Sequence, residues 1–130
     1  MVIRVGMSMV MASAVLATTA VQGEMAAPSY GRDIAPILAH RCFVCHGPDA
    51  STRKSRLRLD TSKGATEKRG RRPAAIVPGD PEASVLWQRI TTDDLEDRMP
   101  PADKGHDAIP AEEAALIHAW IKAGAHYETH

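Results

Sequence analysis

The 130-residue sequence lacks several features that mark large classes of proteins. Neither charge sign is in excess, since the chain has 16 basic and 16 acidic residues. This balance excludes a protein that binds nucleic acid through bulk positive charge, and it also excludes a highly charged disordered chain. Aromatic residues are also few, namely two tryptophans, two tyrosines and one phenylalanine. In a domain of this size, so few large side chains barely offset the entropy of the chain. We therefore expect one small domain whose interior is completed by something other than side chains.

No hydrophobic run is long enough to mark a membrane-spanning helix of about 20 apolar residues. The most apolar stretch, residues 5–16, follows Arg4 and precedes the small residues 17–20, an order typical of a secretory signal peptide. We predict a signal peptide at residues 1–20, a disordered mature N-terminus at residues 21–29, and a protein that is soluble after cleavage and exported to the periplasm or beyond. Contact with a membrane is expected only if the signal segment is retained as an anchor.

Helical patterns are present in three segments of the remaining chain. The first covers residues 33–41, where Asp33 can cap the helix and apolar residues recur at helical spacing. The second begins at Asp80, which is followed by a proline suited to the first helical turn. The third follows Pro110 and ends at Gly124. These patterns predict an all-α fold of three to four helices joined by long loops.

The core is expected where the first and last of these helices cross. This crossing should bury five apolar side chains: Ile34, Leu38, Leu116, Trp120 and Ile121. Residues 56–60 alternate like a short strand, but one isolated strand cannot form a stable sheet. We assign the folded domain to residues 30–127.

The two cysteines stand three positions apart in Cys42-Phe43-Val44-Cys45-His46, a C-x-x-C-H sequence typical of covalent attachment of c-type haem. Thiols at this spacing, at the end of a helix, can both reach the two vinyl groups on one edge of a porphyrin. The next residue, His46, is then brought beneath the iron as its proximal ligand. The motif predicts one haem c bound through Cys42 and Cys45. Export agrees with this chemistry, because the attachment is made outside the bacterial cytoplasm.

Three other interpretations of the cysteines remain. An exported C-x-x-C pair can form a structural or catalytic disulfide, although a thioredoxin-like motif opens a helix after a strand, whereas this motif follows a helix. Zinc could be bound by the cysteines with His126 and His130, but about eighty residues separate the two pairs, far more than in zinc fingers. In the third interpretation, His46 is an incidental surface histidine beside an ordinary cysteine pair.

A sixth ligand to the iron is expected in an electron carrier, and thioether sulfur favours the reduced iron. Without residues 1–20, the only methionines are Met25, in the N-terminal segment, and Met99. Met99 lies more than fifty residues after His46 and precedes two prolines, which prevent a helix from continuing. A methionine can instead fill a gap in a core. We predict Met99 as the distal ligand and expect His118 to be a surface or packing residue.

Several short motifs together resemble the planctomycete-type cytochrome c domain, a variant of the class I cytochromes c. The resemblance extends from Tyr30 to Tyr127 and rests on Arg32-Asp33-Ile34, Pro36-Ile37-Leu38, Cys42-Phe43-Val44-Cys45-His46-Gly47-Pro48-Asp49, Leu57-Arg58-Leu59-Asp60, Ile76-Val77-Pro78-Gly79-Asp80-Pro81, Arg98-Met99-Pro100-Pro101, Trp120-Ile121 and Gly124-Ala125. It implies a compact all-α haem domain in which the two cysteines anchor the haem, His46 is the proximal ligand and Met99 the distal one. The chain departs from many relatives at residues 67–72, which are charged where the relatives are rich in glycine.

The predicted function is electron transfer outside the cytoplasm by a single haem, in a monomer that transforms no substrate and is not an enzyme. Its partners would be redox proteins that donate and accept electrons, with no nucleic acid among them. Two alternatives stay open. A haem with an open distal face could bind small ligands or act as a peroxidase-like enzyme. A haemless secreted module could be held by a disulfide between Cys42 and Cys45.

The zero net charge conceals two segments of opposite sign. Residues 53–72 contain nine basic and two acidic residues, and residues 80–113 contain ten acidic and three basic residues. Both can be ordinary solvated loops, in which one or two arginines pair with haem propionates. Alternatively, the charges form a dipole that orients the molecule toward an acidic region of a redox partner.

Overall fold

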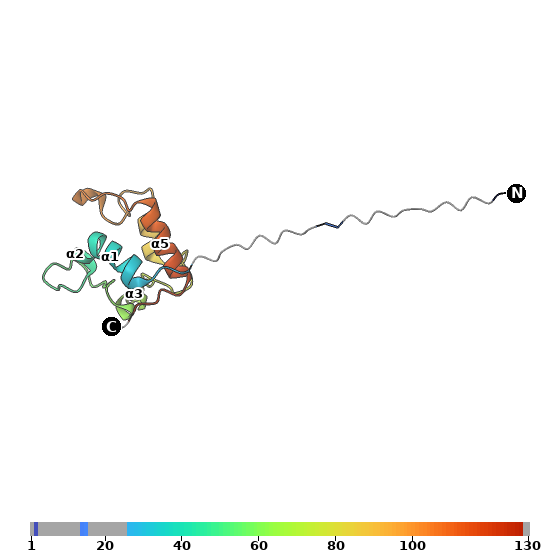
Figure 1. Ribbon diagram of the computed structural model, residues 1–130. Coiled ribbons are helices and arrows are strands. Elements are labelled where there is room, and N and C mark those ends of the chain that lie inside the picture. The colour runs from blue at the N-terminus through green and yellow to red at the C-terminus, as the bar shows by residue number, and fades with distance from the viewer. Residues whose placement is uncertain (1, 3–13, 16–25, 129–130) are drawn as a thin grey trace.

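The computed structural model describes residues 2, 14–15 and 26–128. The predicted signal peptide therefore lies outside the described residues, apart from three isolated positions. From residue 26 onward, the described chain contains the α-helices α1 (Ala35–Arg41), α2 (Phe43–His46), α3 (Ser62–Thr66), α4 (Val85–Thr91) and α5 (Ala111–Lys122), the π-helical turn η1 (Tyr30–Ile34) and the 3-10 turn η2 (Ala102–Lys104). These elements confirm the all-α fold expected from the sequence (Figure 1). None of the described helices is long and apolar enough to cross a membrane.

The first helical segment begins earlier than residue 33 and is capped by another residue. Ser29 is the N-cap of η1, and its hydroxyl accepts a hydrogen bond from the backbone N–H of Arg32 at 3.5 Å. The Asp33 carboxylate accepts one from the backbone N–H of Ser29 at 2.8 Å, four residues earlier in the chain. The prediction that Asp33 caps the helix was therefore wrong, because the turn already begins at Tyr30. Helix α1 continues directly from η1 and leads the chain to Cys42.

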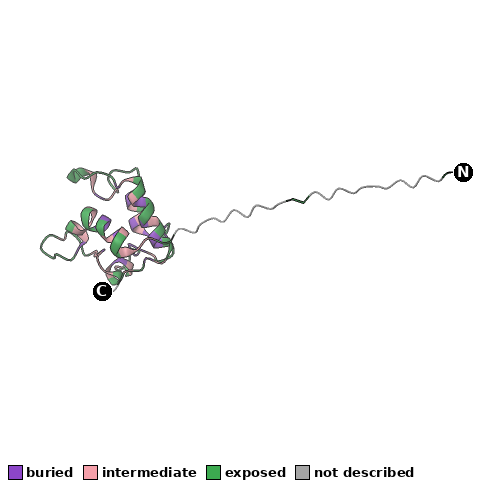
Figure 2. Ribbon diagram, in the orientation of Figure 1, coloured by how far each residue is buried: buried purple, intermediate pink, exposed green. Residues whose placement is uncertain are grey.

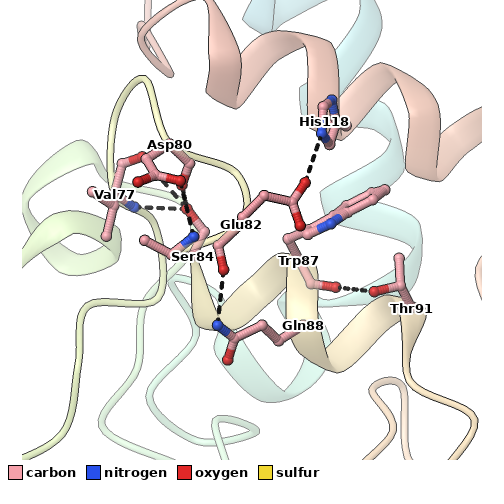
Figure 3. Close-up of polar contacts among 9 residues, drawn as sticks. Val77, Asp80, Glu82, Ser84, Trp87, Gln88, Thr91 and His118 are labelled. Carbon is pink, nitrogen blue, oxygen red and sulfur yellow. Dashed lines mark hydrogen bonds and ion pairs between the residues drawn. The ribbon is translucent and has the colours of Figure 1, made fainter.

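Helix α4 begins at Val85, not at Asp80 as expected. The Asp80 carboxylate instead stabilises a tight turn by accepting a hydrogen bond from the backbone N–H of Ala83 at 3.0 Å. The N-cap is Ser84, whose buried hydroxyl donates to the carbonyl of Asp80 at 2.8 Å and accepts from the backbone N–H of Val77 at 2.9 Å (Figure 3). Local side-chain hydrogen bonds of this kind compete with helix formation, and here they delay the start of the helix.

Helix α5 has the boundaries expected from the sequence, since Pro110 is its N-cap and Gly124 follows its last turn. In its first turn, the Glu113 carboxylate accepts two hydrogen bonds from the Arg41 guanidinium, at 2.9 and 3.1 Å. Arg41 is the last residue of α1. This bidentate ion pair, which is partly shielded from water, fastens the end of α1 to the start of α5.

One hydrophobic core contains side chains from Ile34 to Ala125, and the buried residues are coloured purple along the ribbon in Figure 2. Of the five side chains predicted to be buried at the helix crossing, four are buried: Ile34, Leu38, Trp120 and Ile121. The prediction for Leu116 was wrong, because its side chain is 38% exposed. The buried row of α5 runs through Ala114, Ile117 and Ile121, at i, i+3 and i+7, and Leu116 lies off this row.

The few aromatic residues are concentrated where the two ends of the domain meet. Tyr30, Trp120 and Tyr127 form a cluster with ring centroids 4.5 to 5.7 Å apart, distances that favour aromatic contact. The Tyr127 hydroxyl donates to the carbonyl of Leu59 at 2.8 Å. His118 packs against Trp87 with ring centroids 4.6 Å apart, as expected of a packing histidine (Figure 3).

Candidate haem site

The C-x-x-C-H motif forms a single helical turn at the junction of α1 and α2. The backbone N–H of Cys42 donates to the carbonyl of Leu38 at 2.8 Å, so Cys42 closes α1. The Cys42 carbonyl in turn accepts from the backbone N–H groups of Cys45 at 3.2 Å and His46 at 2.8 Å. Residues at positions i, i+3 and i+4 of such a turn lie on the same face. Positions 42, 45 and 46 therefore lie on one side of the turn, although their donor atoms do not converge on a single point.

Both cysteines are half-buried and are not joined in a disulfide. Cys42 packs against the hydrophobic core, and burial raises the pKa of its thiol to about 12. At neutral pH the Cys42 sulfur is therefore a thiol, whereas disulfide exchange requires a thiolate. Burial of Cys42 therefore disfavours its use as the attacking thiolate of a redox-active C-x-x-C pair.

The His46 ring contacts the Ser55 side chain through its Nδ1 atom. Its Nδ1 lies 3.3 Å from the Ser55 hydroxyl, which also accepts a hydrogen bond from the backbone N–H of Leu57 at 3.0 Å. Burial has the largest effect and lowers the pKa of His46. A backbone hydrogen bond with Leu57 opposes it, the positive charge of Arg69 lowers the pKa further, and the net direction favours the neutral imidazole. A neutral histidine with one nitrogen held by a hydrogen bond and the other free is the form that binds metal ions. When Nδ1 carries the proton and donates to Ser55, the Nε2 lone pair is available to iron.

The loop from Gly47 to Leu59 returns to the motif and completes it. The backbone N–H groups of Lys54 and Leu59 donate to the carbonyls of Cys45 at 3.0 Å and His46 at 2.8 Å, which lack partners within the short helix α2. Gly47 is buried where the chain leaves the turn. A Cβ at this position would collide with the backbone oxygen of Phe43 and would lie 2.7 Å from the Phe43 Cβ. The turn and its loop are thus in close contact along the backbone.

Met99 lies on a separate segment, after α4. Its backbone N–H donates to the carbonyl of Arg89 at 2.9 Å, and Arg89 also binds the Asp97 carboxylate at 2.8 Å. Arg98 donates to the carbonyl of His106 at 2.6 Å. The Met99 side chain is half-buried. The structure therefore brings Cys42, Cys45 and His46 together on one turn and holds Met99 on a segment anchored to α4.

The donor set on the motif turn fits haem c and does not fit zinc. Covalent haem attachment requires two thiols spaced for the two vinyl groups and one imidazole for the iron, and these are the groups that the motif turn carries. Within residues 26–128, no cluster of three or more histidine, cysteine or acidic side chains could hold a metal ion by itself. His130, part of the alternative zinc set, lies outside the described residues.

The sequence analysis missed two residues of this site, Gly47 and Ser55. The glycine could have been suspected from its position directly after a short helix, where chains commonly turn. Nothing in the local pattern distinguishes Ser55, because its contact with His46 depends on the path of the whole loop.

A helical turn carrying two cysteines and a histidine, set in a small all-α domain, defines the class of c-type cytochromes. Residues 42–103 match the family described as Planctomycete cytochrome C. Over this stretch, just under half of its length, the chain is similar to planctomycete-type cytochromes c. The matched stretch includes both the motif turn and Met99. No match was found among curated proteins or among solved structures.

Proposed function

We propose that the protein is an exported monohaem c-type cytochrome that carries electrons between redox proteins and transforms no substrate. The observation that carries this proposal is the motif turn, where Cys42, Cys45 and the Nδ1-bonded ring of His46 share one face. The proposal of export rests on the pattern of residues 1–20 and on the chemistry of haem attachment.

The roles of the residues follow from their chemistry. Cys42 and Cys45 would hold haem through two thioether bonds, because the S–H of a thiol can add across a vinyl double bond without any oxidant or reductant. His46 would bind the iron through Nε2, and we assign the thioether of Met99 as the second protein ligand. The bound haem supplies one-electron chemistry, as its iron alternates between the ferrous and ferric states. Ser55 keeps the His46 ring in the orientation and tautomer that ligation needs.

The haem attachment is tested by producing the protein in a host that has a cytochrome c maturation system. The wild-type protein is expected to keep its haem through acid-acetone extraction and to have the mass of polypeptide plus one haem. A variant with both Cys42→Ser and Cys45→Ser should have the mass of the bare polypeptide. Val44→Ser is the matched control, because this exposed residue lies between the two cysteines and should leave attachment unchanged. A wild-type protein without covalent haem would contradict the proposal.

A further inference from the structure

Residues 55–59 contact His46 at several points, and we call them the histidine-facing strip. The Ser55 hydroxyl lies 3.3 Å from the His46 Nδ1. The ring also makes a hydrogen bond with the backbone of Leu57, and the backbone N–H of Leu59 donates to the His46 carbonyl at 2.8 Å. The strip thus contacts both the ring and the backbone of His46, so the orientation of the ring depends on what keeps the strip in place.

The end of this strip is bound by a residue from the other end of the domain. The Tyr127 hydroxyl donates to the carbonyl of Leu59 at 2.8 Å, although the two residues are 68 positions apart in the chain. The N–H of the same residue, Leu59, bonds to the motif turn. Leu59 therefore joins the C-terminal segment to His46 through the two polar groups of its own backbone, while its side chain is buried in the core.

Tyr127 is itself well fixed. Its ring packs against Tyr30 and Trp120, with centroids 4.5 and 5.1 Å apart. The Trp120 Nε1 donates to the carbonyl of His126 at 3.1 Å, which anchors the chain immediately before Tyr127 to helix α5. Burial raises the pKa of the Tyr127 hydroxyl, so this group stays protonated and able to donate at neutral pH.

We propose that Tyr127 is a positioning residue for His46. By holding the Leu59 carbonyl, it keeps the histidine-facing strip against the motif turn, and Ser55 then stays at the His46 Nδ1. This inference deepens the proposed function and rests on it. An outer hydrogen bond fixes the orientation and tautomer of a ligating histidine and makes it more basic. A more basic ligand favours the ferric iron, so loosening the strip should raise the reduction potential.

The test compares Tyr127→Phe with Tyr30→Phe. Both variants keep the aromatic ring and remove one hydroxyl, and the two rings are neighbours in the same cluster. Only Tyr127→Phe removes the contact with Leu59. Mass and optical spectra first establish whether covalent haem is present, which tests the proposed function separately.

We expect Tyr127→Phe to have a higher reduction potential than Tyr30→Phe. The haem-methyl signals in the NMR spectrum of the oxidised protein should also move, because their pattern depends on the orientation of the axial histidine ring. The Leu59 amide should exchange its hydrogen about tenfold faster than in Tyr30→Phe. If Tyr127→Phe lowers stability but shares its potential and NMR pattern with Tyr30→Phe, Tyr127 is merely structural and the proposal is overturned.

Ser55→Ala tests the route of the effect, because it removes the contact with the His46 Nδ1 directly. This variant should raise the potential by itself. When Tyr127 acts through the strip, Tyr127→Phe combined with Ser55→Ala should have the same potential as Ser55→Ala alone. Shifts that simply add would contradict the proposed route.

A protein without haem would refute the proposed function and still test the role of Tyr127. The ¹⁵N chemical shifts of the His46 ring, measured where the ring is neutral, report which nitrogen carries the proton. Wild type and Tyr30→Phe should hold the proton on Nδ1, whereas Tyr127→Phe should show a mixture of tautomers. The same tautomer in all three proteins would overturn the proposal.

Discussion

Gly47 shows how one missing side chain lets the loop approach the motif turn. A Cβ on this residue would meet the backbone oxygen and the Cα of Phe43, neither of which can move without displacing the turn. Gly31 is different, because a Cβ there would meet only the flexible end of the Glu128 side chain. The two glycines therefore form a matched pair for substitution by alanine.

We expect Gly47→Ala to lower the free energy of unfolding by roughly 1–3 kcal/mol, the usual cost of forcing an extra group into a packed site. Because the turn must shift to accept the methyl group, the yield of covalent haem should fall as well. Chemical denaturation and haem absorbance measure the two effects. Gly31→Ala should change neither by a comparable amount, and equal behaviour of the two variants would show that the backbone contact is unimportant.

Met99 provides the second prediction at this scale. Met99→Ala should remove the weak far-red band of sulfur-bonded ferric haem, lower the reduction potential and let the reduced iron bind carbon monoxide, because the sixth coordination position becomes open. Met25→Ala, which changes the other methionine outside residues 1–20, is the control and should match wild type. An oxidised spectrum that Met99→Ala leaves unchanged would refute the distal assignment. Strong carbon monoxide binding by wild type would instead favour a ligand-binding haem protein.

The residues of the site differ in how far the sequence predicts them. Cys42, Cys45 and His46 could be identified because their chemistry depends on spacing within one turn, which is a local property. Gly47 is indicated only by its position after a short helix, and Ser55 could not be identified, because its contact with His46 arises only when the loop to Leu59 folds back on the turn. Long-range contacts of this kind leave no periodic signal in a single sequence.

Among the elements, helices that bury a regular apolar row were predicted well, and those that depend on capping contacts were not. The sequence predicted α5 with its ends from Pro110 and Gly124, although the buried row proved to run through Ala114 and not through Leu116. The start of α4 was misplaced because the turn at Asp80 has a cap of its own. Helix α3 was not predicted at all. It is only five residues long and is capped by the Thr61 side chain, which accepts from the backbone N–H of Gly64 at 3.1 Å.

The position of α4 leads to a prediction about Ser84. This residue is fully buried, and its hydroxyl satisfies the carbonyl of Asp80 and the backbone N–H of Val77 (Figure 3). Ser84→Ala leaves both groups without that partner and should lower the free energy of unfolding by about 1–3 kcal/mol. Ser62→Ala, at an exposed site in α3, is the control and should stay within about 0.5 kcal/mol of wild type. Similar midpoints of thermal or chemical unfolding for the two variants would contradict this account.

At the scale of the whole molecule, the structure refines the contrast between the basic segment 53–72 and the acidic segment 80–113. Two basic residues of the first segment are paired with its own acids, since Arg58 binds Asp60 at 2.6 Å and Lys63 lies 4.0 Å from Glu67. Three more basic residues, Arg56, Arg69 and Arg72, line one cavity together with Ser55 and Gly70. The basic residues that stay exposed, form no ion pair in the described chain and lie outside the cavity include Lys54, Lys68 and Arg71.

We expect Lys54, Lys68 and Arg71 to steer anionic redox partners toward the haem, because opposite charges raise the rate of encounter without requiring tight binding. Changing all three to glutamate should slow oxidation of the reduced protein by ferricyanide about tenfold at low ionic strength and speed oxidation by a cationic cobalt complex. The matched control changes three exposed basic residues elsewhere, Arg32, Lys104 and Lys122, to glutamate and therefore has the same net charge. Stopped-flow rates should differ between the two triple variants at low salt and converge as salt screens the charges. If the two variants instead react equally fast with ferricyanide at every salt concentration, net charge alone sets the rate and segment 53–72 has no special part in docking.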